Sequence, residues 1–349
     1  MSGTPPPVWR PLGLVFAFTA GCGCTLLVTQ HMAETGATPP QRRLAEVVSA
    51  TENQHGCAPT PREAVAAMLA ANRNRLSDKT KRHGYQAAYG PFLAPFIRKP
   101  IRLLEIGMES GASVKLWSNL FPNLRQMYGI AYAGADENQA SVAFARGQGL
   151  RKGRSKSHPS DKLTLFHGDQ SDVAFLRTVA ADLNGTSIDV IIDDGSHVPQ
   201  HQLVSFVQLF PTLADGGLYI IEDVETSYWD KKGGAELFGY KIEAGIGTRG
   251  SAVESFKQLP DVLNRQFLGD PSYSIFGAQH KQQVDHRIAS VAFSRNCIIV
   301  TKKVSTEWQQ LDNLDRGGYM LRNMLDPARE QYKAFRAARG RMNPIRKER

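Results

Sequence analysis

Short apolar runs alternate with amphipathic stretches from about residue 100 onward. The apolar runs have the length of buried strands and lie at 102–106, 126–131, 163–166, 188–192 and 218–221. Stretches with helical spacing of apolar residues lie between them, at 112–120, 173–183 and 200–213. Strands that alternate with helices of crossover length predict a parallel, doubly wound α/β sheet. Two last runs, 288–293 and 297–302, are separated by Ser294-Arg295-Asn296 and predict a hairpin with an antiparallel final strand, so that the sheet would have seven strands.

Two further helices are predicted before the first strand. The stretch REAVAAMLAANRNRL begins after Pro61, with alanine, methionine and leucine on one side. The stretch SDKTKRHGYQAAYGPFLAPF contains a second helix, which is rich in aromatic residues. Between the fifth strand and the hairpin, residues 224–284 show no clear period, and their aromatic residues suit a lid over a bound substrate.

The N-terminal region has a different composition. Leu12–Val28 reads LGLVFAFTAGCGCTLLV, an uncharged apolar run at the short end for a helix that crosses a membrane. We expect a signal-anchor in residues 1–30, a polar linker in 31–60 and a single-pass membrane protein of the secretory pathway. A cleaved signal peptide and an organellar transit segment are the alternatives.

Charge and cysteine content exclude several classes of protein. The net charge is +9, but residues 329–349 alone contribute +6. A basic excess confined to a tail does not favour a nucleic-acid partner. Four cysteines without a CxxC pair argue against a disulfide scaffold or a cysteine-based zinc site.

The first predicted strand leads into a glycine-bearing turn, Glu105-Ile-Gly107-Met-Glu-Ser-Gly111. Such a turn lets a ligand approach backbone N–H groups. The spacing is not the dinucleotide fingerprint, because Glu109 and Ala112 stand where glycines would be needed. The carboxylate of Glu105 instead suits a cationic cofactor, as S-adenosylmethionine is.

The next two strands give mixed signals for that cofactor. The second strand usually ends in an acid that binds the ribose, but this chain has Ala131 there, and Asp136 or Glu137 would have to replace it. After the third strand, Asp169 is placed to accept a hydrogen bond from an adenine amino group. A helix N-cap is the other interpretation of this aspartate.

Carboxylates gather after the fourth and fifth strands. Asp193-Asp194-Gly-Ser-His197 follows the fourth strand, and Glu222-Asp223 follows the fifth. Open α/β sheets bind ligands at the carboxyl ends of their strands. Like charges so close together favour a cation between them, and oxygen donors select Mg²⁺ or another hard divalent cation. His197 is free to act as a general base.

These stretches resemble a known family. The sequences SDKTKRHGYQAAY, LLEIGMESGAS, FHGDQSD, DVIIDDGSHVPQHQ and LFPTLADGGLYIIEDVETSYW, with the final hairpin, are similar to class I S-adenosylmethionine-dependent methyltransferases. More narrowly, they resemble the magnesium-dependent macrolide-sugar O-methyltransferases and the cephalosporin-hydroxylase-like group. The resemblance covers residues 77–302 and implies a Rossmann-like methyltransferase domain, for which we expect the bounds 61–304. A basic helical extension at 305–349 lies outside the resemblance and is expected from the sequence.

The resemblance also implies roles for particular residues. Magnesium would be bound by Asp194, Glu222 and Asp223, and His197 would be the catalytic base. Cofactor contacts would come from Glu105, Gly107, Gly111, Asp169, Gln170 and Asp193.

The expected function follows from these roles. The chain would be an S-adenosylmethionine-dependent O-methyltransferase acting on a vicinal diol of a sugar or glycosylated metabolite, and it could form homo-oligomers. A catechol-type or other small-molecule O-methyltransferase needs the same site and is the alternative. A non-catalytic, membrane-tethered protein of the same fold is the second alternative.

Overall fold

The computed structural model describes residues 58–73, 77–132, 156–160, 162–229, 235–265, 273–280 and 283–304. All of them belong to one compact unit, Ala58–Arg349. The predicted anchor at 12–28, almost all of the linker, Asp136, Glu137 and the basic extension lie outside the described residues.

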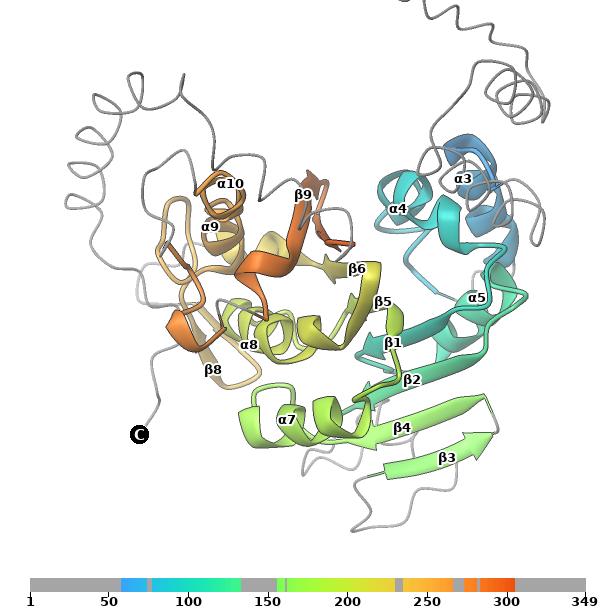
Figure 1. Cartoon of the computed structure of the whole chain (residues 1–349), viewed down its shortest axis with the longest axis horizontal. Helices are drawn as coiled ribbons and strands as arrows, with labels where there is room; N and C mark the ends of the chain where they lie inside the picture. The colour runs from blue at the N-terminus through green and yellow to red at the C-terminus, as the bar shows by residue number, and fades with distance from the viewer. Residues whose placement is uncertain are drawn as a thin grey trace, which may run out of the picture. The chain divides into compact units, whose positions relative to one another are not determined.

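An eight-stranded sheet forms the centre of the described part of the chain, in the order β3-β4-β2-β1-β5-β6-β10-β9 (Figure 1). Its five central strands are parallel, and β3, β9 and β10 pair antiparallel at the two edges. The bounds are β1 Arg102–Ile106, β2 Gln126–Ala131, β3 Lys156–Ser160, β4 Leu163–His167, β5 Ile188–Asp193, β6 Leu213–Glu222, β9 Ile288–Ser294 and β10 Cys297–Lys302. The parallel sheet and the terminal hairpin confirm the sequence prediction.

One strand of this eight-stranded sheet was not predicted. Strand β3 pairs antiparallel with β4 and gives the sheet eight strands in place of seven. Its sequence, KSHPS, has no apolar residue, so the pattern of buried positions gives no signal for it.

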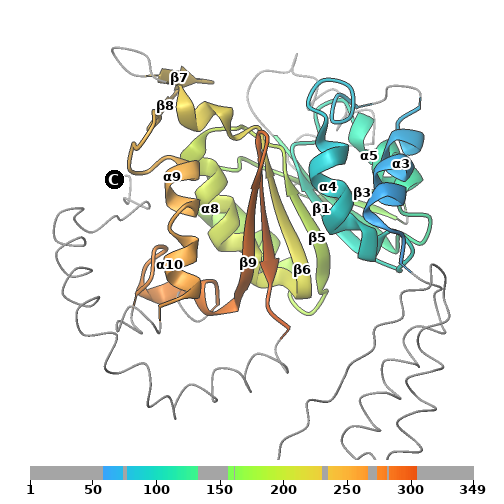
Figure 2. The ribbon, with the colours of Figure 1, turned by 90° about the horizontal axis from the view of Figure 1, so that it is seen from above.

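Helices cover both faces of the sheet (Figure 2). One face carries α3 (Pro61–Ala71), α4 (Tyr85–Leu93) and α5 (Ala112–Leu120). The other carries α7 (Val173–Asp182), α8 (Pro199–Leu209), α9 (Ala252–Phe256) and α10 (Leu259–Leu263). Successive strand residues point to opposite faces, so Leu103 packs with the first group and Leu104 with the second. Burial on both faces explains why the strands are apolar throughout.

Local sequence signals set where the helices begin. Helix α3 starts with a capping box, in which Thr60 and Glu63 bond to each other's backbone N–H groups. Helix α7 starts at Asp172, whose carboxylate accepts from the N–H groups of Ala174 and Phe175. Helix α8 has Pro199 in its first turn, where the missing N–H costs nothing.

The segment predicted to be a lid is only partly separate from the core. It contains the short 3-10 helix η3 (Val224–Tyr228), the hairpin of β7 (Ala235–Leu237) and β8 (Tyr240–Ile242), and helices α9 and α10. Phe256 is fully buried, with its ring centroid 4.9 Å from that of Phe206 on α8. Since α9 and α10 are part of the core, the part of this segment left for a lid is 224–250, and its role as a lid stays a prediction.

The expected single-pass membrane location is corrected by the structure. Over the ranges that the structure describes, no helix has both the length and the apolar character that crossing a membrane requires. The expectation rested on residues 12–28, which lie outside those ranges.

Candidate metal and cofactor site

The carboxylates predicted to lie together do so at the ends of β5 and β6. The two strands are parallel neighbours, with Asp193 opposite Ile221, so Asp194 and Glu222 leave the sheet side by side. The backbone N–H of Asp194 donates to the carbonyl of Ile106, at 3.0 Å. This bond brings the end of β5 beside the turn that follows β1.

Lys79 lies among these carboxylates. Its Nζ is 2.5 Å from Asp194 Oδ2, 2.9 Å from both oxygens of Glu222 and 3.5 Å from Glu105 Oε1. The Lys79 side chain is only 2% exposed. Burial by itself would lower the pKa of Lys79, but the charges of Asp194, Glu222 and Glu105 outweigh it and hold this pKa well above its usual range. Lys79 is therefore a permanently charged ammonium inside the site.

The loop that carries Lys79 is fixed by the end of α3. Asn72, which is buried, donates from Nδ2 to the carbonyl of Ser77 and to Thr80 Oγ1, at 2.7 Å in each case. Its Oδ1 accepts from the Ser77 N–H at 3.0 Å. One side chain thus holds both ends of the short turn around Lys79.

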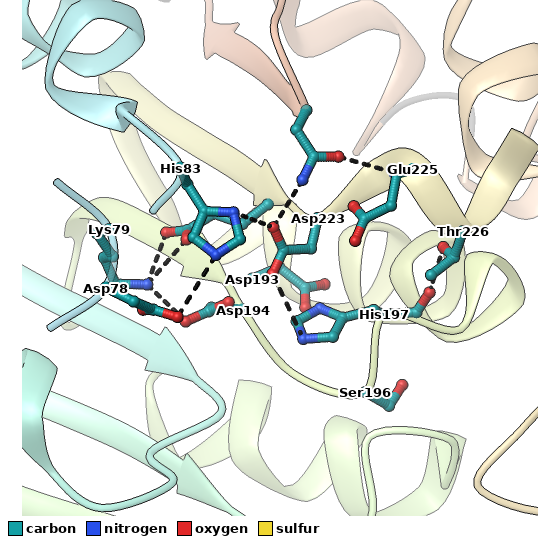
Figure 3. Close-up of polar contacts among 12 residues, drawn as sticks. Asp78, Lys79, His83, Asp193, Asp194, Ser196, His197, Asp223, Glu225 and Thr226 are labelled. Atoms are coloured by element: carbon teal, nitrogen blue, oxygen red, sulfur yellow. Dashed lines mark hydrogen bonds and ion pairs between the residues drawn. The ribbon is translucent and has the colours of Figure 1, made fainter. Parts of the chain in front are cut away.

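Asp223 is the centre of a second set of contacts (Figure 3). The Tyr85 hydroxyl donates to Asp223 Oδ1 and accepts from the Asp223 N–H. Asn296 Nδ2 donates to the same Oδ1 at 2.8 Å, and His83 Nδ1 lies 3.3 Å from it. Asp223 has a φ of 52°, in the left-handed region that few residues other than glycine adopt. Strain of this kind persists where the surroundings fix the residue, and it gathers at functional sites.

His197 faces Asp223 from the turn before α8. Its Nε2 is 3.7 Å from Asp223 Oδ2, and its backbone also has a positive φ, of 56°. The Thr226 hydroxyl donates to the carbonyl of His197 at 2.6 Å and holds this turn against η3. His197 Nδ1 is buried and bonds to no residue that the structure describes.

These contacts place Asp194 and Asp223 apart from Glu222, the third predicted metal ligand. One ligand atom from each of Asp194, His197 and Asp223 lies within 4.8 Å of the others, which is close enough for one shared cation. Glu222 instead directs both oxygens at Lys79. Burial, and then the charge of Asp194, raise the pKa of Glu222 well above its usual range. The metal-binding role of Glu222 and the role of His197 as a base stay predictions.

The predicted cofactor residues around β1 lie at the same edge of the sheet. Glu105 is fully buried, accepts from the Ser113 hydroxyl at 2.6 Å and lies beside Lys79. Gly107 has a φ of 90°, and an added Cβ would lie 1.9 Å from the Asp194 carbonyl oxygen. Gly111 has a φ of 75° and caps α5. The turn is therefore packed directly against the metal-site loop.

Asp169, Gln170 and Asp193 have internal partners. Asp169 Oδ1 accepts from the Ser171 N–H at 2.7 Å, and Oδ2 accepts from the Tyr240 hydroxyl at 3.0 Å. Gln170 is buried and joins Asp193 Oδ1 (2.7 Å) to the Ser196 N–H (2.9 Å). These bonds tie β4 to β5.

Asp193 has no exposed surface, and the Ser205 hydroxyl donates to its Oδ2 at 2.5 Å. This arrangement supports the Asp194 loop. Direct cofactor contact by Asp169, Gln170 and Asp193 stays a prediction.

Sequence reasoning did not single out four residues of this site: Lys79, His83, Tyr85 and Asn296. Three of them are in the stretch SDKTKRHGYQAAY, which carried part of the family resemblance, but no role was assigned to any residue in it. The charge imbalance of the predicted site was the available signal. Four clustered carboxylates need more positive charge than one divalent cation supplies.

Comparison with known proteins agrees with this geometry. Residues 104–224 match the family described as "Methyltransferase domain". The 8-demethyl-8-alpha-L-rhamnosyl tetracenomycin-C 2'-O-methyltransferase of Streptomyces olivaceus is 30% identical over 237 residues, which are 66% of this chain and 53% of that protein. The mycinamicin VI 2''-O-methyltransferase of Micromonospora griseorubida is 28% identical over 67% of this chain and 56% of that protein.

A solved structure matches as well. The methyltransferase MycE of the mycinamycin biosynthetic pathway, in complex with Mg and SAH, is 26% identical with a TM-score of 0.51, over 69% of this chain and 55% of that one. The chain thus spans about half the length of the relatives that it matches. Residues 104–224 thus match a methyltransferase domain, and over part of its length the chain is similar to the sugar O-methyltransferases named above.

Proposed function

We propose that this chain transfers a methyl group from S-adenosylmethionine to a hydroxyl of a sugar or glycosylated small molecule, with the help of a divalent cation. One observation carries the proposal. Ligand atoms of Asp194, His197 and Asp223 lie within 4.8 Å of one another, beside the glycine turn after β1. The relatives named above are O-methyltransferases, and the MycE structure is described as a complex with Mg and SAH.

The residues present fit a hard cation. The carboxylates of Asp194 and Asp223 offer oxygen donors, which suit Mg²⁺ or Mn²⁺, and the His197 imidazole beside them is left free of the cation to act as the base. The Asp194 side chain is 24% exposed, so part of it is open to solvent. Its Oδ2 contacts Lys79, which leaves Oδ1 for a cation. Asp223 is similarly divided, since Oδ1 receives three contacts and Oδ2 faces His197.

The residues around the glycine turn fit the cofactor as well. Glu105 Oε1 is buried and has no hydrogen bond, although it lies near Lys79, so one carboxylate oxygen is left beside the turn. We propose that Glu105, Gly107 and Gly111 hold the methionine part and that Asp169 reaches the adenine.

The reaction then requires a base and fixed geometry. When bound, the cofactor supplies an electrophilic methyl group on sulfur, and the cation lowers the pKa of a hydroxyl bound to it. His197 accepts the hydroxyl proton at Nε2, which faces Asp223. The Thr226 hydroxyl holds the backbone of His197 in place by donating to its carbonyl. Tyr85 and Asn296 hold the Asp223 carboxylate, so the carboxylate oxygen that faces His197 is in position before the methyl group is transferred.

The test is formation of S-adenosylhomocysteine by the purified chain, with a panel of rhamnosides, other glycosides and catechols, in Mg²⁺ or in EDTA. We expect turnover with glycosides in Mg²⁺ only. Asp194→Asn should abolish it, and His197→Ala should lower kcat by on the order of 10²–10⁴ while S-adenosylhomocysteine still binds. Asp182→Asn, at an exposed carboxylate at the end of α7, is the control and should match the wild type. Full activity in EDTA, or a His197→Ala protein as active as the wild type, would contradict the proposal.

A further inference from the structure

A hollow of about 430 Å³ lies beside Asp223. Three segments that are far apart in the sequence form most of its wall, and Val253 of α9 completes it. The three segments are the turn before α4 with Arg82 and His83, the helix η3, and the tip of the β9–β10 hairpin. The catalytic and cofactor residues discussed above do not line it, so it is a separate space at the edge of the site.

The hollow opens next to the candidate cation site. His83 and Asn296 line it, and both contact Asp223 Oδ1, at 3.3 Å and 2.8 Å. In Figure 3, His83 and Glu225 lie on either side of Asp223. A molecule whose hydroxyl is held at Asp223 can therefore extend its neighbouring part into the hollow.

The hairpin tip is held rigidly against this site. Ser294 pairs with Cys297 across a two-residue turn, in which Asn296 has a positive φ of 56°. Asn296 Oδ1 accepts from the Glu225 N–H at 2.8 Å, and the carbonyl oxygen of Asn296 lies 3.1 Å from the Tyr85 hydroxyl oxygen. The backbone of Arg295 is therefore fixed one residue away from an Asp223 contact.

The charges that line the hollow are unequal. Arg82 and Arg295 are exposed, and neither guanidinium bonds or pairs with any residue in the described ranges. Glu225 is the single carboxylate of the lining. A guanidinium binds carboxylate or phosphate through two parallel hydrogen bonds, so two unpaired ones favour an anion.

Aromatic rings complete the lining. Tyr228 is 47% exposed and Phe293 is 46% exposed, and both line the hollow. Large apolar side chains at the surface beside a polar site are typical of ligand-binding pockets. Their faces suit the apolar face of a sugar ring, while the two arginines suit a charged substituent on it.

We propose that this hollow binds an anionic group, a carboxylate or a phosphate, carried by the acceptor next to the hydroxyl that is methylated. Arg82 and Arg295 bind the anion, and Tyr228 and Phe293 pack on the ring. The proposal rests on the proposed function, and it narrows the substrate to acidic or phosphorylated sugars. Neutral glycosides would still be methylated, but they would bind more weakly than anionic sugars.

The test compares three sugars that share a vicinal diol: methyl α-D-glucoside, methyl α-D-glucuronide and glucose 6-phosphate. Their binding to the full chain is measured by ligand-observed NMR, with Mg²⁺ and S-adenosylhomocysteine present. We expect at least one of the two anionic sugars to bind about tenfold more tightly than the glucoside, since one charge-assisted contact is worth about one decade in affinity. Which of the two binds better distinguishes a carboxylate from a phosphate.

Variants then assign the preference to the hollow. Arg82→Gln/Arg295→Gln should reduce the preference to within about twofold, whereas Arg62→Gln, at an exposed arginine of α3 outside the hollow, should preserve it. Equal binding of all three sugars by the wild type, or a preference that survives the double substitution, would overturn the proposal. Loss of S-adenosylhomocysteine binding or of methyl transfer in the wild type would instead refute the proposed function, so the two failures are distinguishable.

Discussion

Replacing Lys79 by methionine tests how much the buried ammonium contributes to the fold. Its Nζ contacts Asp194 and Glu222 at 2.5 and 2.9 Å, and Glu105 is 3.5 Å away. Methionine fills a similar volume, but it leaves buried carboxylates without a counter-charge. Breaking a buried ion pair from one side typically costs about 3–5 kcal/mol. In a domain of this size, such a loss lowers Tm by about 10 °C.

Thermal and urea denaturation of the purified chain in EDTA measure this effect. Lys257→Met is the matched control, because Lys257 forms an exposed ion pair with Glu254 at 2.7 Å and should contribute less than about 1 kcal/mol. Adding Glu222→Gln to Lys79→Met should recover part of the loss, because it removes one of the unpaired charges. If Lys79→Met were as stable as Lys257→Met, our account of Lys79 as the counter-ion of this site would be wrong.

Three further predictions concern the supports of the site. Gly107→Ala should prevent folding or cofactor binding, because the added Cβ would lie 1.9 Å from the Asp194 carbonyl oxygen. Gly185 has a similar positive φ with open space around it, so the control Gly185→Ala should cost only about 1 kcal/mol of stability. Urea denaturation of both variants measures the difference. Burial raises the pKa of Asp193 to about 6, so the folded chain keeps this proton longer than the unfolded chain. The free energy of unfolding should therefore fall by about 3 kcal/mol as the pH rises from about 4 to about 6. Asp193→Asn should flatten that part of the pH profile. Tyr85→Phe removes a donor to Asp223 and should weaken Mn²⁺ binding several-fold in a titration, with little change in Tm.

The sheet could be predicted from the sequence because its strands are buried on both faces. Continuous apolar runs such as 188–192 need no partner to be recognised, and the helices between them impose the parallel order. Strand β3 could not be predicted, because an edge strand of polar residues depends on its neighbour β4 and not on burial. The same limit applies to α9 and α10, which are five residues each and are buried only through contacts with distant side chains.

The site was predictable where topology alone decides the outcome. Asp194 and Asp223 follow adjacent strands, so the sheet brings them together in any chain that has this strand order. The position of Lys79 depends on how the turn between α3 and α4 folds over the sheet edge, which Asn72 determines through three hydrogen bonds. Because the sequence did not indicate where Lys79 lies, it gave no sign that the Glu222 carboxylate, a predicted metal ligand, contacts Lys79 in the structure.

Mn²⁺ binding measured by electron paramagnetic resonance, with S-adenosylhomocysteine present, tests the central claim most directly. We predict one Mn²⁺ per chain in the wild type, loss of this site in Asp194→Asn and in Asp223→Asn, and competition by Mg²⁺ at the same site. A wild-type chain that binds no Mn²⁺, or one that binds it equally well after both aspartates are replaced, would contradict the account.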